Sequence, residues 1–218
     1  MKAVELHAFG GPEQLTLAER PEPAVGAGEV RILVKAIGVN FSDVLMRQDR
    51  YAATPTLPAV LGAEIAGIVD AIDPEVTHVA VGDRVVAALF ATGNSIGGYA
   101  EQVVTRAEWV APVPDAVPLD MAAASLVTGL TARYLLDRSP VRGKTVLITA
   151  AAGGVGSTLV QMAKAEGAAR VIAGWLNPVA SVAAPTVSGP SCHSALSSGM
   201  CPGCVCNPQS RPIASAPA

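Results

Sequence analysis

Charged side chains stop almost completely at residue 170 of this 218-residue chain, and this break limits how much of the chain can form an ordinary fold. All 18 acidic residues lie at or before Glu166, and Arg211 is the single charged residue after Arg170. The stretch 175–218 is rich in proline and serine. Because proline interrupts helices and central strands, we expect regular structure in 1–174 and an irregular tail in 175–218.

The tail does not resemble an evolved linker, because disordered segments usually carry a high charge and this one carries almost none. We interpret it as a frame-shifted sequence, read from a reading frame other than that of residues 1–174. It holds all four cysteines, Cys192, Cys201, Cys204 and Cys206. A C-x-x-C-x-C run can bind zinc or copper or form a redox pair, but nothing around it predicts the folded frame of a zinc site. We therefore expect no metal there, and a metal-binding tail stays a third alternative.

Composition excludes several classes of protein for the chain as a whole. A net charge of −3 and a pI of about 5.6 argue against a nucleic-acid partner, which normally selects a basic surface. No 18-residue stretch is apolar without interruption by charge or proline, so we expect no membrane span. The N-terminus lacks the apolar core of a signal peptide, so we expect a cytoplasmic protein.

The first part of the chain has the pattern of a β domain. Short alternating or apolar segments separated by glycine and proline recur up to residue 118, which is typical of a barrel or sandwich. Asn40 or Ser42 is a suitable N-cap for one short helix. The predicted strands cover 3–8, 14–17, 29–39, 63–72, 84–89 and 99–105, and the predicted helix covers 42–48.

From residue 119 the pattern changes to that of an α/β protein. Helical spacing covers 119–136, with a break expected at Gly129. The segment 144–150 is a continuous apolar strand, which predicts burial on both faces of a parallel sheet. A helix is predicted over 153–166 and a second strand over 170–174. These last three elements form one β–α–β unit.

A glycine-rich turn joins the predicted strand to the predicted helix of this unit. The turn reads Ala-Ala-Gly-Gly-Val-Gly over 151–156 and matches the dinucleotide-binding fingerprint, with Ala151 in place of the first glycine. Amide groups and the positive end of the helix would hold a pyrophosphate there. An ordinary βα turn is the alternative. The predicted cofactor-binding residues are Ala151, Gly153, Gly154, Val155 and Gly156.

Six motifs in the same order resemble the medium-chain dehydrogenase/reductase superfamily, and within it the zinc-independent quinone oxidoreductases of the zeta-crystallin-like branch. The resemblance covers residues 1–174 and includes the glycine-rich turn. It implies an α/β fold with a GroES-like β-barrel substrate domain over 1–118, the start of a truncated Rossmann domain over 119–174, and then the irregular tail. The motifs occupy 28–35, 38–43, 61–67, 81–85, 97–101 and 128–132.

The resemblance also implies a function. Enzymes of this branch use NADPH, with NADH as the alternative cofactor, to reduce quinones or activated C=C and C=O bonds by hydride transfer without zinc. The expected partner is a small quinone or enone, and family members often form homodimers. A truncated nucleotide domain could leave this chain inactive. The alternative function is that of a non-catalytic remnant or binding module that retains the GroES-like domain.

The resemblance places Asn40, Asp43, Tyr51 and Thr128 near the nicotinamide as candidate catalytic residues. Zinc-using relatives have cysteine at Asn40 and histidine at Ala63, and neither residue found here supplies a zinc ligand. Tyr51 would polarise a substrate carbonyl. Simpler roles remain open, with Asn40 as a helix cap, Asp43 as a solvated first-turn acid and Tyr51 as a packing aromatic. For Glu64, beside Ala63, we expect a structural hydrogen bond.

Overall fold

A computed structural model describes residues 1–92 and 97–174 of the chain. The expectations for the tail 175–218, including its four cysteines and any metal site there, therefore lie outside the described residues. Backbone contacts divide the chain into two units, Met1–Val127 and the part that begins at Thr128. The elements of the first unit are β1 (Lys2–Leu6), η1 (Pro12–Gln14), β2 (Leu15–Glu19), β3 (Glu29–Gly38), α1 (Phe41–Arg47), β4 (Ala59–Val60), β5 (Glu64–Ile72), β6 (Arg84–Ala88), η2 (Leu89–Thr92), β7 (Gln102–Arg106), η3 (Ala107–Trp109) and β8 (Val110–Pro112).

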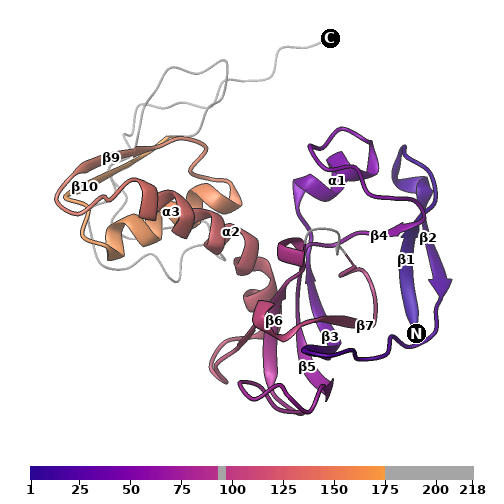
Figure 1. Ribbon diagram of the computed structural model, residues 1–218. Coiled ribbons are helices and arrows are strands. Elements are labelled where there is room, and N and C mark those ends of the chain that lie inside the picture. The colour runs from indigo at the N-terminus through magenta and orange to yellow at the C-terminus, as the bar shows by residue number, and fades with distance from the viewer. Residues whose placement is uncertain (93–96, 175–218) are drawn as a thin grey trace, which may run out of the picture. The chain divides into compact units, whose positions relative to one another are not determined.

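The main sheet of the first unit has five antiparallel strands in the order β7-β3-β5-β6-β8 (Figure 1). The pairing of β3 with β5 runs from Val30 opposite Ile72 to Gly38 opposite Glu64. Its register shifts between Val34 and Ala36, where the strand bulges and bends. This pairing brings the end of β3 next to the start of β5.

A second sheet has three antiparallel strands in the order β2-β1-β4. Backbone hydrogen bonds join β1 to the segment that precedes β7, with 2.8 Å from the Val4 N–H to the Tyr99 carbonyl and 3.0 Å from the Glu101 N–H to the Lys2 carbonyl. The Val34 N–H binds the Glu101 carbonyl at 2.9 Å, on the other side of the same segment. The two sheets are therefore hydrogen-bonded through residues 99–101.

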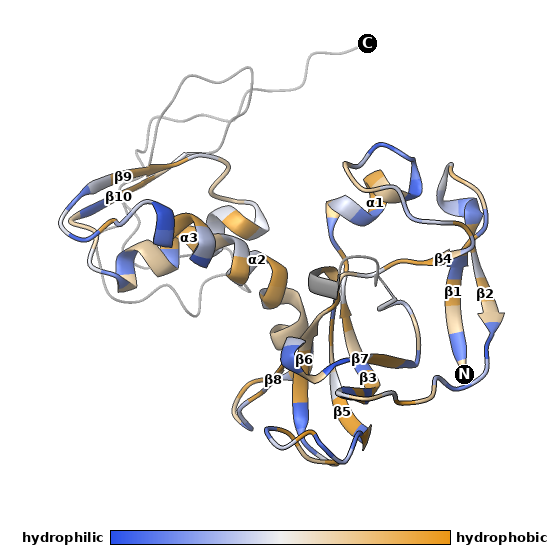
Figure 2. Cartoon of the chain, viewed as in Figure 1, coloured by the Kyte–Doolittle hydropathy of each residue, from blue (hydrophilic) through white to orange (hydrophobic). Residues whose placement is uncertain are grey.

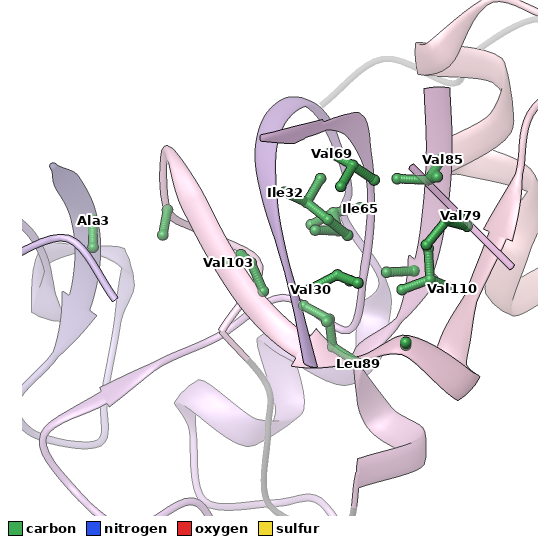
Figure 3. Packing of buried hydrophobic residues seen from close by; sticks show 13 residues of the cluster. Ala3, Val30, Ile32, Ile65, Val69, Val79, Val85, Leu89, Val103 and Val110 are labelled. Atoms are coloured by element: carbon green, nitrogen blue, oxygen red, sulfur yellow. The ribbon is translucent and has the colours of Figure 1, made fainter. Parts of the chain in front are cut away.

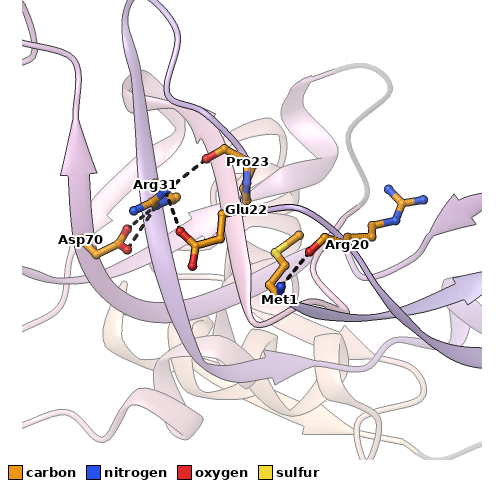
Figure 4. A network of polar contacts seen from close by, with 6 residues as sticks. All are labelled: Met1, Arg20, Glu22, Pro23, Arg31 and Asp70. Carbon is orange, nitrogen blue, oxygen red and sulfur yellow. Dashed lines mark hydrogen bonds and ion pairs between the residues drawn. The ribbon is translucent and has the colours of Figure 1, made fainter.

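Polar contacts attach the segment after β2 to the main sheet (Figure 4). The Nε of Arg31 on β3 donates to both carboxylate oxygens of Asp70 on β5, at 3.0 and 3.2 Å. The guanidinium also contacts Glu22 at 3.6 Å and the Pro23 carbonyl at 3.3 Å. The hydrogen bond to Asp70 raises the pKa of Arg31. This arginine thus holds one irregular segment against two neighbouring strands.

The core of the first unit lies between its strands and is almost entirely aliphatic (Figure 3). Its centre is formed by alternate residues of β3, β5 and β6, as expected for strands with one face turned inward. A smaller cluster of Leu6, Met46 and Leu61 packs α1 against β1. The fully buried members of the main core include Val30, Ile32, Ile65, Val85 and Ala87.

The second unit contains the β–α–β arrangement predicted from the sequence. Strands β9 (Thr145–Ile148) and β10 (Arg170–Ala173) are parallel, and α3 (Gly154–Ala165) joins them. Helix α2 (Leu119–Arg138) begins in the first unit and ends in the second. Apolar residues of α2, α3 and both strands form a separate core, whose buried members are Leu136, Val141, Ile148, Ala163 and Val171.

Two details of the prediction for this region are wrong. Helix α2 continues through Gly129 without a break, because a single glycine weakens a helix by only about 1 kcal/mol and does not interrupt its hydrogen bonds. The strand β9 is not buried on both faces. Val146 and Ile148 belong to the core with α3, whereas Leu147, on the opposite face, is 63% exposed. Figure 2 colours part of β9 as hydrophobic. Within residues 97–174, no element covers that face.

The other predicted elements agree with the structure to within a few residues, and β4 and β8 were not predicted. The sequence predicts a domain boundary at residue 118, and the division by backbone contacts falls after Val127, inside α2. Among the described residues, none of the helices is long and apolar enough to cross a membrane.

Replacement of a core residue tests the packing of the first unit. We expect Ile65→Ala to lower the free energy of unfolding by about 2–5 kcal/mol, because Ile65 is fully buried and its removal leaves a cavity. Urea unfolding measures this change. Leu17→Ala is the matched control, since Leu17 is 69% exposed and its loss should change stability by no more than about 0.5 kcal/mol. Equal effects of the two variants would contradict the described core.

Candidate functional site

Asn40 lies at the junction of β3 and α1, where it is the N-cap residue of the helix. Its backbone is extended, with φ −113° and ψ 155°, as N-cap residues require. The Asp43 carboxylate accepts a hydrogen bond from the Asn40 backbone N–H at 2.8 Å, which is the arrangement of a capping box. The expected capping role of Asn40 is therefore confirmed.

Asp43 is not a solvated acid, because only 3% of its surface is exposed. One carboxylate oxygen, Oδ2, accepts both the Asn40 N–H and the hydroxyl of Tyr99, the latter at 3.1 Å. The other oxygen, Oδ1, is buried without a hydrogen-bond partner. Burial, followed by the Asp43 charge, raises the pKa of Tyr99 well above its usual value, so its hydroxyl stays protonated and donates to Asp43.

Glu64 is the second buried carboxylate of this region, with 2% of its surface exposed. Its Oε1 accepts a hydrogen bond from the side-chain Nδ2 of Asn40 at 2.8 Å. Its Oε2 accepts the backbone N–H of Val127, in α2, at 2.6 Å. The structural hydrogen bond expected for Glu64 is thus confirmed, and it links the first residue of β5 to the cap of α1 and to a turn of α2.

The pairing of β3 with β5 leaves room for this carboxylate only because residue 38 is glycine. Gly38 lies opposite Glu64, and a Cβ on it would lie 2.2 Å from Glu64 Oε1. Burial raises the pKa of Glu64, while the hydrogen bonds from Val127 and Asn40 lower it and the Asp43 charge raises it further. The net effect is a pKa above the usual value near 4.5.

The other two candidate catalytic residues lie on different elements of the chain. Tyr51 follows α1 on an irregular segment, and its side chain is 42% exposed. Thr128 is the first residue of the second unit and is half-buried in α2. The structure thus brings Asn40 and Asp43 together, with Tyr51 in the same unit and Thr128 in the other.

The glycine-rich turn has the geometry of an open helix N-terminus. Gly153 is the N-cap of α3, with an extended backbone and no side-chain cap, and residues 152–154 are exposed. The first backbone N–H groups of a helix have no acceptor within it, so those of Gly154, Val155 and Gly156 form no hydrogen bond inside α3. Ala151 donates its N–H to the Gly174 carbonyl at 2.9 Å, which places the end of β10 beside the turn.

Two glycines of the turn are required by close packing. A Cβ on Gly156 would lie 2.2 Å from the Ala150 carbonyl oxygen, so α3 approaches the end of β9 as the fingerprint predicts. A Cβ on Gly154 would lie 2.9 Å from the side-chain methyl of Thr128. Thr128 therefore packs directly on the start of α3, and it shares this location with the predicted cofactor-binding residues.

Metal ligands do not gather in the described part of the chain, where no three of its histidine, cysteine, aspartate and glutamate side chains form a possible metal group. Asn40 hydrogen-bonds to Glu64, the neighbour of Ala63, so the two positions that hold ligands in zinc-using relatives are close together here but carry no ligand. His7 contacts Glu5 at 2.9 Å and His78 contacts the Ala107 carbonyl at 2.8 Å, away from this network.

Sequence comparison identifies the kind of domain. Residues 26–115 match the family model of the alcohol dehydrogenase GroES-like domain. The quinone oxidoreductase of Pseudomonas aeruginosa is 44% identical to this chain over 168 residues, which cover 76% of this chain and 50% of that protein. The chain therefore spans about half the length of the curated relatives that it matches.

Solved structures agree with the sequence comparison. The Escherichia coli quinone oxidoreductase complexed with NADPH superimposes with a TM-score of 0.71 and 38% identity, over 79% of this chain and 52% of that one. The human synaptic vesicle membrane protein VAT-1 homolog-like protein gives a TM-score of 0.74 and 36% identity, over 80% of this chain and 55% of that one.

Sequence reasoning did not identify Val127 and Tyr99 as part of the network. Val127 contributes only a backbone N–H, and an apolar residue inside a helix gives no sign that its amide binds a carboxylate. Tyr99 lies in the motif 97–101, but its contact with Asp43 spans 56 residues and depends on how the two segments fold together.

The turn of the second unit can be tested with two alanine substitutions. Gly156→Ala should destabilise the protein by about 1–3 kcal/mol, because its methyl group would overlap the backbone at Ala150. Gly129→Ala should instead stabilise it by about 0.5–1 kcal/mol, since a Cβ there meets no atom within 4 Å and alanine favours a helix. Thermal unfolding of both variants gives the comparison. Stabilisation by both substitutions would show that α3 does not approach the strand this closely.

Ionisation of Glu64 should make stability depend on pH in a defined direction. Since its folded pKa is raised above about 4.5, the folded protein binds a proton more tightly than the unfolded chain. The contribution of Glu64 is therefore fully present below about pH 4.5, is lost as the pH rises from there through the folded pKa, and is constant above it. The free energy of unfolding is measured for wild type and for Glu64→Gln at a series of pH values. We expect the wild-type value minus the Glu64→Gln value to decrease as the pH rises from about 4.5 through the folded pKa of Glu64. A difference that increases with pH would mean that the folded pKa is lowered.

Proposed function

Because residues 1–174 belong to the medium-chain dehydrogenase/reductase superfamily, with quinone oxidoreductases as homologues, we propose that the chain serves NADPH-dependent reduction of quinones or activated C=C and C=O bonds without zinc. In this proposal the first unit forms the substrate domain. The second unit supplies the first β–α–β unit of the nucleotide-binding domain.

The glycine-rich turn is the observation that carries the proposal. Gly153 and Gly154 are exposed at the start of α3, and no side chain forms a cap hydrogen bond there. The helix N-terminus adds a partial positive charge, so Gly154, Val155 and Gly156 would hold the cofactor pyrophosphate. The bound cofactor would supply the hydride. We propose NADPH as the cofactor in place of NADH, because the homologous quinone oxidoreductase of Escherichia coli is complexed with NADPH.

Reduction without zinc is supported by the residues at the end of β3 and the start of β5. Asn40 and Ala63 offer no thiolate or imidazole, and the polar groups that do lie there are hydrogen-bonded to one another. A carbonyl substrate would then be polarised by side-chain donors in place of a metal.

In the proposed site, Asn40 and Tyr51 donate to the substrate carbonyl, and Thr128 lies beside the cofactor turn. Asp43 acts indirectly by holding Asn40 in place, because its carboxylate is already bound to the Asn40 backbone and to Tyr99. These donors would stabilise the negative charge that develops on the substrate oxygen as it is reduced, which is the usual role of such groups.

A non-catalytic binding module is the alternative, and one observation favours it. The first unit has a complete core, whereas β9 leaves Leu147 63% exposed on a sheet of two described strands. A two-stranded sheet is marginally stable by itself. In this alternative the first unit folds and persists, and the second unit does not bind a nucleotide.

Titration with NADPH distinguishes the two functions. We expect the wild-type chain to bind NADPH, and Gly153→Ala to raise the dissociation constant at least about tenfold, because a methyl group on this exposed turn would keep the pyrophosphate from the amides. Gly129→Ala is the control and should leave the constant unchanged. Calorimetry measures binding, and a parallel titration with NADH measures cofactor preference.

Absence of NADPH and NADH binding to the wild-type chain would reject the enzymatic proposal and favour the binding module. Equal dissociation constants for wild type and Gly153→Ala would show that the cofactor binds somewhere other than at this turn.

A further inference from the structure

Glu64 is a buried carboxylate whose two oxygens are both occupied, and neither partner is a cation. Asn40 Nδ2 binds Oε1 at 2.8 Å, and the Val127 N–H binds Oε2 at 2.6 Å. An ionised carboxylate accepts hydrogen bonds and donates none. Glu64 therefore requires a donor at each of its two sides, and the structure supplies one from a helix backbone and one from the side chain of Asn40.

This requirement decides which end of the Asn40 carboxamide faces Glu64. If the amide were turned over, its oxygen would face a carboxylate oxygen and two acceptors would repel each other. The side-chain nitrogen of Asn40 must therefore point to Glu64. Because the carboxamide is planar, this also fixes the position of its side-chain oxygen. The second N–H of Nδ2 stays available as a donor.

The backbone of Asn40 is held separately. Asp43 accepts its N–H, and Tyr99 donates to the same Asp43 oxygen. Asp43, on α1, is the acid that acts on Glu64, and Arg47, one helical turn further along α1, is buried as well. Glu64 itself lies within the main sheet, between Gly38 of β3 and Ala88 of β6.

We propose that Glu64 is a positioning residue, which holds the Asn40 carboxamide in a single orientation so that its free N–H can serve a substrate carbonyl. The carbonyl as the target rests on the function proposed above. The orientation itself is argued from the contacts of Glu64 with Asn40 and with Val127 and does not depend on that function.

Protonation of Glu64 would change this arrangement. One carboxyl oxygen would become a donor, and it would face either the Val127 N–H or the Asn40 nitrogen, which are donors themselves. The Val127 N–H belongs to the backbone of α2 and cannot turn, whereas the Asn40 carboxamide can. The proton would therefore lie on Oε1, and the carboxamide would turn over to offer its oxygen. The orientation of Asn40 should therefore follow the ionisation of Glu64.

Nuclear magnetic resonance of the 218-residue chain tests the orientation without any substrate. The side-chain NH₂ signals of Asn40 are assigned by their loss in Asn40→Asp. In wild type we expect these signals to shift with pH in a single transition centred above about pH 4.5, the usual value for glutamate. In Glu64→Gln that transition should disappear. Glu5→Gln is the matched control, because Glu5 is also buried but contacts Arg20 and His7 instead.

Steady-state kinetics with NADPH and a quinone tests the link to substrate. Glu64→Gln should lower kcat/KM about tenfold, the effect expected when one hydrogen bond no longer orients Asn40, and Glu5→Gln should leave it unchanged. A wild-type chain without activity would reject the function proposed above, and the resonance experiment would still decide the positioning role. Asn40 signals that titrate identically in wild type and in Glu64→Gln would overturn the proposal. Asn40 signals without any transition in wild type would overturn it as well, and that result does not need Glu64→Gln to fold.

Discussion

The pairing of β3 with β5 is the constraint on which the site depends. This antiparallel ladder ends with Gly38 opposite Glu64, so the residues that follow β3 necessarily lie beside the start of β5. Glycine at position 38 leaves the space in which the Glu64 carboxylate is buried. Once buried, the carboxylate needs donors on both sides, because an unsatisfied charged group is costly in the interior. Asn40 and Val127 meet that need, and they connect the β domain to the beginning of α2.

Close backbone packing has the corresponding role in the second unit. Gly156 allows α3 to approach the end of β9, and residues 152–154 at the start of this helix are exposed. The same unit has an apolar sheet face with Leu147 exposed within the described residues. Nucleotide binding requires the turn, whereas stability requires that apolar faces be covered. These separate requirements explain why cofactor binding and folding of this unit must be measured independently.

Much of the fold was predictable because the signals are local. The alternation of polar and apolar residues over 29–39 marked β3, and the glycine-rich turn marked the start of α3. Asn40 and Asp43 are three residues apart, so their capping contact could be anticipated as well. Local patterns are weaker where they predict burial, since the apolar composition of 144–150 suggested a strand covered on both faces. The cytoplasmic location stays a prediction.

The sequence by itself determined most of the secondary structure, the glycine-rich turn and the absence of a cysteine or histidine at Asn40 and Ala63, because each of these depends on residue type and short-range spacing. Only the tertiary structure decided that Glu64 binds the Asn40 side chain, that Tyr99 binds Asp43, and that Thr128 packs on Gly154. These contacts join residues that are distant in the chain. Their existence depends on strand register and helix packing, which no local pattern encodes.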